Sequence, residues 1–117
     1  MKLMISLDKN ILDKNSAAAK RMISYGMRED LFIILPDKQN KIVELSEKVK
    51  VYATGGSKLS QFCRLKKIGR KILQENKIDL ITTQDPFFTG LVGVWLKKKS
   101  KINLEVQLHG DFFSSDY

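Results

Sequence analysis

Residues 79–113 contain two short apolar runs joined by a helical pattern, and this arrangement restricts the chain to few folds. Residues 80–83 and 104–108 indicate strands because both runs are rich in apolar and β-branched side chains. Between them, apolar side chains recur at helical spacing from Phe88 to Leu96. Two consecutive parallel strands joined by a helix form a right-handed βαβ unit. The segment therefore predicts part of a parallel sheet.

Local signals mark both ends of the helix in this unit. Asp85 can accept hydrogen bonds from free backbone N–H groups at the helix start, and Pro86 fits the first turn. Three lysines, at positions 97–99, close the helix where cations suit its dipole.

The rest of the chain continues the alternation of apolar strands and helices. Ser16 is the predicted N-cap of the first helix, and residues 38–48 are compatible with either a minor edge strand or a turn. In chain order, the predicted elements are strand 2–7, helix 17–25 with Gly26 as a stop, strand 31–35, strand 49–54, a turn at 55–57 and helix 59–76. The strands are continuous apolar runs, as sheets covered on both faces require. The chain is thus expected to be one α/β domain over 1–117, with a Rossmann-like, mostly parallel sheet and helices on both faces.

Composition excludes several classes of protein. With 43% hydrophobic and 29% charged residues, the chain is an ordinary globular protein rather than a disordered tail. Its single cysteine, Cys63, rules out an internal disulfide and a CxxC metal site. Cys63 falls on the apolar stripe of the second long helix, so it is expected to be buried and inert. No apolar run is long enough to span a membrane, which favours a cytoplasmic protein.

The net charge of +8 is concentrated in the helix over 59–76 and its flanks. Residues 58–77 carry seven cations and one acid. This charge is compatible with a solvated helix face, with an anionic membrane surface or acidic acceptor, and with nucleic acid. The last partner is disfavoured, because the chain has no zinc-finger spacing, no RNP-like aromatic set and no helix-turn-helix pattern.

Two polar residues follow strands of the predicted sheet. Asp85 comes after strand 80–83 and the only histidine, His109, comes after strand 104–108. Open α/β sheets bind ligands at the carboxyl ends of their strands, so both positions are candidates for ligand contact. For Asp85 the competing role is helix capping, and for His109 it is a purely structural one.

A set of short motifs resembles the N-terminal domain of the family 4 glycosyltransferases, which have the GT-B fold. The motifs are residues 79–86 (DLITTQDP), residues 89–93 (TGLVG) and His109-Gly110 at a strand end. The order of the upstream elements also agrees, so the resemblance covers essentially all 117 residues. It implies one half of an enzyme whose two Rossmann-like domains face each other across a cleft.

The resemblance implies the acceptor-side domain of a retaining glycosyltransferase that uses a nucleotide-sugar donor and needs no metal or other cofactor. The acceptor would be a glycan, a lipid-linked molecule or a small molecule. Position by position, His109 matches the family's cleft histidine, and Gly110 lets the backbone approach the ligand. Asp85 matches a polar cleft position, and Asn15 and Ser16 match the loop beside the donor phosphates.

The chain departs from the family pattern in two ways. Residues 16–18 read Ser-Ala-Ala where the family often has a Gly-Gly pair that approaches a diphosphate. The donor domain with its acidic E-x7-E type motif is absent from these 117 residues. We therefore expect a fragment that lacks the C-terminal donor-binding domain and is inactive alone.

Two other classes of protein compete with this hypothesis. A phosphoacceptor receiver domain needs clustered acids after its first strand, where this chain has only Asp8. A stand-alone Rossmann-like module that binds a nucleotide, nucleic acid or a protein would explain the charge, but the G-x-G-x-x-G and P-loop patterns are missing. The leading hypothesis is a cytoplasmic enzyme domain of cell-envelope glycan synthesis, docked through helix 59–76 to the anionic inner face of the cell membrane.

Overall fold

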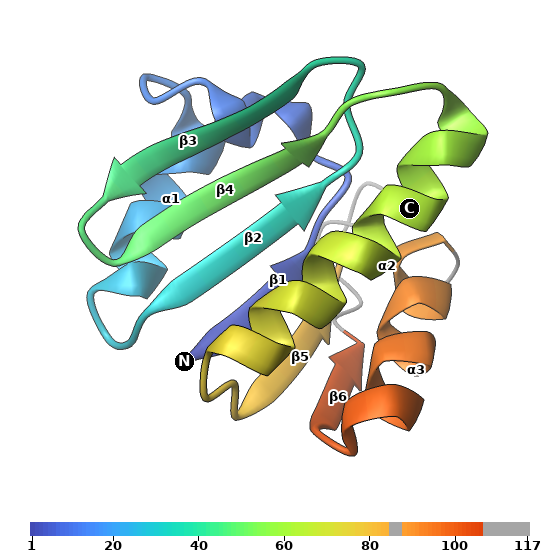
Figure 1. The fold of residues 1–117 in the computed structure, drawn as a ribbon. Coiled ribbons are helices and arrows are strands. Elements are labelled where there is room, and N and C mark those ends of the chain that lie inside the picture. The colour runs from blue at the N-terminus through green and yellow to red at the C-terminus, as the bar shows by residue number, and fades with distance from the viewer. Residues whose placement is uncertain (85–87, 107–117) are drawn as a thin grey trace, which may run out of the picture.

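The computed structural model of the chain describes residues 1–84 and 88–106, and Figure 1 shows its fold. The strands and helices follow one another in the predicted order. The elements are β1 (Lys2–Ile5), the 3-10 helix η1 (Lys9–Leu12), α1 (Ala17–Gly26), β2 (Leu31–Leu35), β3 (Asn40–Ser46), β4 (Val49–Thr54), α2 (Lys58–Glu75), β5 (Leu80–Thr83), α3 (Phe88–Ser100) and β6 (Asn103–Val106).

The described strands form one sheet in the order β3-β4-β2-β1-β5-β6. Neighbouring strands are parallel except for β3, which runs antiparallel to β4 at the edge. In Figure 1, α1 lies behind the sheet, whereas α2 and α3 lie side by side in front of it. The predicted fold class is confirmed: this is a Rossmann-like, mostly parallel sheet with helices on both faces. Of the two structures compatible with residues 38–48, the edge strand is the one that forms.

The side of the sheet covered by α1 contains one hydrophobic core. Its fully buried residues include Ile11, Ala19, Ile33, Leu35, Val49 and Val51. Ser16 begins α1 as predicted, because its Oγ accepts a hydrogen bond from Ala19 N at 3.0 Å. The cap fixes where the helix starts, and the small side chains of Ala18 and Ala19 let it lie close to the strands. Gly26 is the last residue of α1, one position inside the helix that it was predicted to follow as a stop.

The opposite side contains a second core beneath α2 and α3. Its fully buried residues include Leu3, Ile5, Ile34, Leu65, Ile81, Val92 and Leu96. Gly69 lies where the two helices meet, and a Cβ atom there would be 2.7 Å from Leu96 Cδ1. Glycine at this position therefore allows the two helices to pack closely.

The predicted burial of Cys63 is wrong. Cys63 is exposed, and Leu59, one turn earlier, is 86% exposed. The buried stripe of α2 instead contains Gln61, Leu65, Gly69 and Ile72. Because successive helical residues are about 100° apart, positions 59 and 63 fall on the side of the helix away from that stripe.

Candidate functional site

The strand order places a topological switch point between β1 and β5. From β1 the chain continues to β2 on one side, and β5 pairs with β1 on the other side. Ser6 directly follows β1, and Gln84 directly follows β5. In open α/β sheets, ligands bind in the crevice outside the carboxyl ends of the strands at such a point. Ser6 and Gln84 are therefore the central described residues of the candidate site.

Hydrogen bonds join these two side chains. Ser6 Oγ donates to Gln84 Oε1 and accepts from Asp8 N at 3.1 Å. Gln84 Nε2 contacts Met4 Sδ at 3.4 Å, and Gln84 N donates to Ile5 O at 3.1 Å. Ser6 is fully buried and Gln84 is half-buried. A polar pair held in this way can present the free positions of the amide to a neutral polar ligand such as a sugar hydroxyl.

Two unpartnered hydroxyls lie at the end of β5, directly before Gln84. Thr82 and Thr83 end β5, and their side chains point to opposite faces of the sheet because successive strand residues alternate. Both side chains are buried, and neither Oγ1 atom has a hydrogen-bond partner within the described part of the chain. Buried polar groups are nearly always hydrogen-bonded, so the end of β5 has unused capacity to bind a polar group.

Basic side chains lie farther along the same edge. Lys9 Nζ is 3.8 Å from Asp37 Oδ1, which links the loop after β1 to the loop after β2. Arg64 in α2 donates from Nη1 to Thr54 O at 3.2 Å, at the end of β4. The turn there requires glycine, since Gly55 and Gly56 have φ angles of 73° and 89°. This confirms the predicted turn and shows that cations lie at the β2 and β4 end of the site.

The predicted site residues have different outcomes. Asp85, His109 and Gly110 lie outside the described residues. Asn15 and Ser16 form the end of the loop between η1 and α1. Asn15 N donates to Asp13 Oδ1 at 3.0 Å. Ser16 Oγ lies 2.6 Å from Asn10 O and 2.8 Å from Asp13 O, in addition to capping α1. The hydroxyl of Ser16 is thus used to build the loop, and ligand contact by either residue stays a prediction.

Ser6 and Gln84 are functional candidates that the sequence interpretation missed. Each is a polar residue that ends an apolar strand, and this signal was present in the sequence. Their pairing was not visible there, because it depends on β1 and β5 being neighbours across 78 positions of chain.

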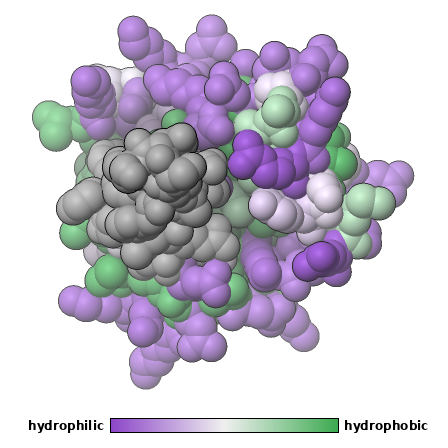
Figure 2. Space-filling view, turned by 180° about the vertical axis from the view of Figure 1, so that it is seen from behind, coloured by the Kyte–Doolittle hydropathy of each residue, from purple (hydrophilic) through white to green (hydrophobic). Residues whose placement is uncertain are grey.

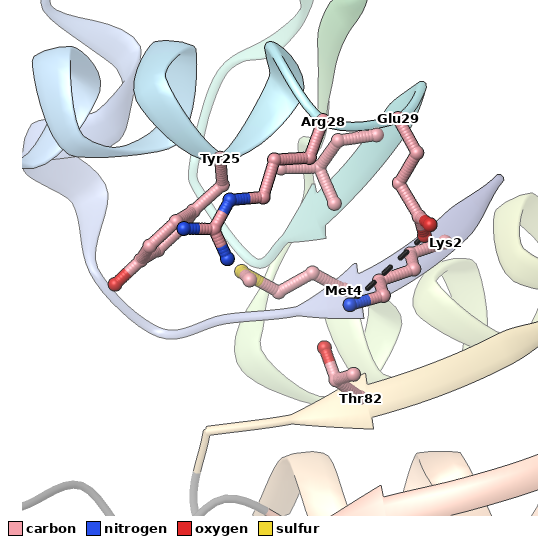
Figure 3. A pocket seen from close by; sticks show the side chains of 7 residues that line it. Lys2, Met4, Tyr25, Arg28, Glu29 and Thr82 are labelled. Carbon is pink, nitrogen blue, oxygen red and sulfur yellow. Dashed lines mark ion pairs between the residues drawn. The ribbon is translucent and has the colours of Figure 1, made fainter.

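A pocket of about 330 Å³ opens on the α1 side of the sheet (Figure 3). It is lined by Lys2, Met4, Tyr25, Arg28, Glu29, Leu31 and Thr82. Lys2 and Leu31 are the first residues of β1 and β2, so the pocket lies toward the amino ends of these strands. Lys2 Nζ pairs with Glu29 Oε1 at 4.0 Å across its rim. Among the described residues, the lining includes neither Asn15 nor Ser16, and the pocket meets the candidate site near Met4 and Thr82.

Residues 1–84 and 88–106 contain no group of three His, Cys, Asp or Glu side chains placed to hold a metal ion. In the same ranges, every helix is too short or too polar to cross a bilayer.

Comparison with known proteins gives information on the fold. No protein-family model and no curated protein sequence matches the chain. The C-terminal domain of a hydrogenase from Pyrococcus furiosus is 15% identical, with a TM-score of 0.56 over 91% of this chain and 89% of that one. The UDP-GlcNAc 2-epimerase from Methanocaldococcus jannaschii is 20% identical, with a TM-score of 0.55 over 94% of this chain. The chain spans only 32% of the epimerase, and likeness at this level shows a Rossmann-type α/β fold alone.

Proposed function

We propose that the chain is the N-terminal, acceptor-side domain of a retaining glycosyltransferase. In this proposal it forms one wall of a cleft, and a second Rossmann-like domain supplies the other wall and binds the nucleotide-sugar donor. The domain needs no metal or other cofactor, and by itself it does not transfer sugar. The proposed activity is inferred from the resemblance of residues 79–93 and His109-Gly110 to the family 4 enzymes.

The switch point between β1 and β5 is the observation that supports the proposal most. At such a point α/β enzymes bind substrates. Ser6 and Gln84 form a polar pair there, and the unpartnered hydroxyl group of Thr82 lies near Met4 on the same side of the sheet. Hydroxyl and amide groups suit the many hydroxyls of a sugar, because each can both donate and accept.

The similarity in fold to an enzyme that acts on a UDP-sugar also supports this proposal. The epimerase acts, by its name, on UDP-GlcNAc, and its fold matches this chain along nearly the whole length. The match covers about a third of the epimerase, which agrees with a domain that works together with others. Its low identity carries no residue roles across.

The roles of the sequence-predicted residues form part of this proposal. His109 orients an acceptor or donor hydroxyl through its imidazole, and Gly110 lets the backbone approach the sugar. Asp85, one residue after Gln84, contacts the acceptor as well as capping the next helix. Asn15 and Ser16 lie beside the donor phosphates.

Reading the gene beyond the codon for Tyr117 is the first test. The proposal expects the frame to continue into a second Rossmann-like domain that contains a Glu-rich donor motif. Transfer of labelled sugar by that complete enzyme is then measured with a panel of nucleotide sugars. We expect His109→Ala and Gln84→Ala to lower the transfer rate by about 10²-fold or more, as for lost groups that position substrate. Unchanged rates in folded variants would remove these residues from the site.

A non-catalytic binding module is the alternative, and the hydrogenase domain is the observation that favours it. That domain has nearly the same extent as this chain and shares its fold. The alternative expects an in-frame stop after codon 117 and no transfer activity in any protein that contains the chain.

A further inference from the structure

We propose that the outward surface of α2 and α3 docks on an anionic lipid bilayer. These helices pack side by side on one face of the sheet (Figure 1), and we call their exposed outer side the two-helix surface. The two helices contain nine lysines and arginines and one acid, Glu75. The rest of the chain contains twelve cations and twelve acids. The whole excess of +8 is therefore located on this one layer.

The apolar and basic parts of the two helices are in register. Both helices return from the carboxyl edge of a parallel sheet, so they run in the same direction. Lys66 shows which parts of α2 and α3 lie beside each other, because its Nζ is 4.6 Å from the ring centroid of Phe62 on α2 and 5.3 Å from that of Trp95 on α3. Lys99 Nζ lies 5.7 Å from the same Trp95 ring. The aromatic rings and lysines thus form one connected seam between the helices.

The amino-terminal half of the two-helix surface exposes large apolar side chains. Leu59 is 86% exposed on α2, while Leu91 and Val94 are 62% and 42% exposed on α3. Leu59, Cys63, Lys66 and Arg70 share the outward side of α2, and Leu91, Val94 and Lys98 share that of α3. Among these outward-facing residues of each helix, the apolar ones come first and the cations follow.

Most cations of this surface are available for binding. Within the described residues, the ion pair of Lys71 with Glu75, at 4.0 Å, is the only one that these nine cations make. Like charges concentrated on one layer repel one another and oppose folding, so this density favours an external anion as partner.

A bilayer fits this surface better than nucleic acid does. Apolar tips beside long basic side chains suit the lipid interface, where the tips enter the acyl region and the cations meet the headgroups. Single-stranded nucleic acid binding instead uses aromatic rings on which bases stack. On the two-helix surface Lys66 lies over the rings of Phe62 and Trp95, and the outermost side chains are aliphatic. The inference does not depend on the proposed transfer reaction.

Vesicle binding of the 117-residue chain tests the inference. The chain is sedimented with vesicles of phosphatidylcholine and phosphatidylglycerol in equal parts, and with vesicles of phosphatidylcholine alone. We expect binding only to the anionic vesicles. Arg70→Glu with Lys98→Glu should weaken it by more than about 100-fold, since each cation near such a surface contributes roughly fivefold and each reversal counts twice. The matched control is Lys20→Glu with Arg21→Glu on α1, which changes the net charge equally and should keep most of the binding.

A second pair of variants tests the apolar tips. Leu59→Ser with Leu91→Ser should weaken binding to the anionic vesicles about tenfold or more, because two inserted side chains are lost. Met27→Ser with Ile42→Ser removes side chains that are 75% and 65% exposed elsewhere, and it should leave binding unchanged.

Two natural probes report whether the correct surface is bound. Trp95 is the only tryptophan, and its emission should shift to the blue and be quenched by brominated lipid. Cys63 is the only cysteine and is exposed, so its alkylation should slow with anionic vesicles. In a Cys63→Ser chain that carries Ser24→Cys on α1, alkylation should not slow. The proposal would be overturned if the test and control variants lost vesicle binding equally, or if Trp95 emission and Cys63 alkylation did not change with anionic vesicles. Binding to duplex DNA without binding to anionic vesicles would also overturn it.

Discussion

The two layers that cover the sheet differ in charge, although each consists of helices packed on the same strands. Residues 8–30, which contain η1 and α1, carry five cations and four acids, whereas α2 and α3 carry nine cations and one acid. In Figure 2, which views the α1 side, the described residues are mostly hydrophilic, so this layer has a polar surface without a large excess of charge. Covering a sheet requires an apolar helix stripe but no excess charge. We therefore attribute the difference to binding and not to folding.

Truncation of adjacent residues in β2 would compare the cores beneath the two layers. Ile33 and Ile34 are both fully buried, and they point to the α1 side and the α2–α3 side respectively. We expect Ile33→Ala and Ile34→Ala each to lower the free energy of unfolding by about 2–5 kcal/mol, measured in urea. A loss under about 1 kcal/mol for one of them would show that its core is loosely packed.

The contact between α2 and α3 is tested by Gly69→Ala. The added methyl group would lie 2.7 Å from Cδ1 of the fully buried Leu96, so that side chain would have to move. Overpacking costs about 1–3 kcal/mol, and the better helix propensity of alanine offsets up to about 1 kcal/mol. We expect a net loss of about 1 kcal/mol or more in urea unfolding. Cys63→Ala on the exposed side of α2 is the control, and it should change stability by less than about 0.5 kcal/mol.

Local signals in the sequence were sufficient to predict the fold. Strands 31–35 and 49–54 are observed as predicted, because short runs rich in apolar and β-branched residues that end at proline or glycine indicate strands. The N-cap at Ser16 depends on residues only three positions apart, so it was also predictable. The exposure of Cys63 was not, because α2 has apolar residues on two sides and only packing decides which stripe is buried.

The candidate site and the charged layer could not be predicted from local patterns, because both are formed by parts of the chain that are distant in the sequence. Ser6 and Gln84 meet because β1 has β2 on one side and β5 on the other, a strand order that local patterns do not determine. The lysines at positions 97–99 were interpreted as helix-dipole partners. That these lysines share one surface with the cations of α2 follows only from the packing of the two helices against each other.

The helix starts of the two layers also differ, and serine substitutions would measure this difference. Ser16 Oγ caps α1, whereas Ser57 begins α2 without a hydrogen bond from its side chain to the backbone. Ser16→Ala should therefore lower the free energy of unfolding by about 1 kcal/mol, and Ser57→Ala by only a few tenths. Thermal and urea unfolding of both variants would measure this difference. Equal losses would mean that Ser57 caps α2 in solution.

Glu75→Gln gives the smallest expected change in stability and tests the charge contrast directly. The Lys71–Glu75 pair spans 4.0 Å between exposed side chains, and such pairs contribute within about 0.5 kcal/mol. Unfolding should thus be nearly unchanged. The substitution removes the one acid from α2 and α3, so binding to anionic vesicles should strengthen by up to about fivefold. Glu44→Gln on β3 adds the same charge to the edge strand, and it should leave vesicle binding unchanged. If both variants strengthen binding equally, net charge alone governs it, and the two layers do not differ as partners of a membrane.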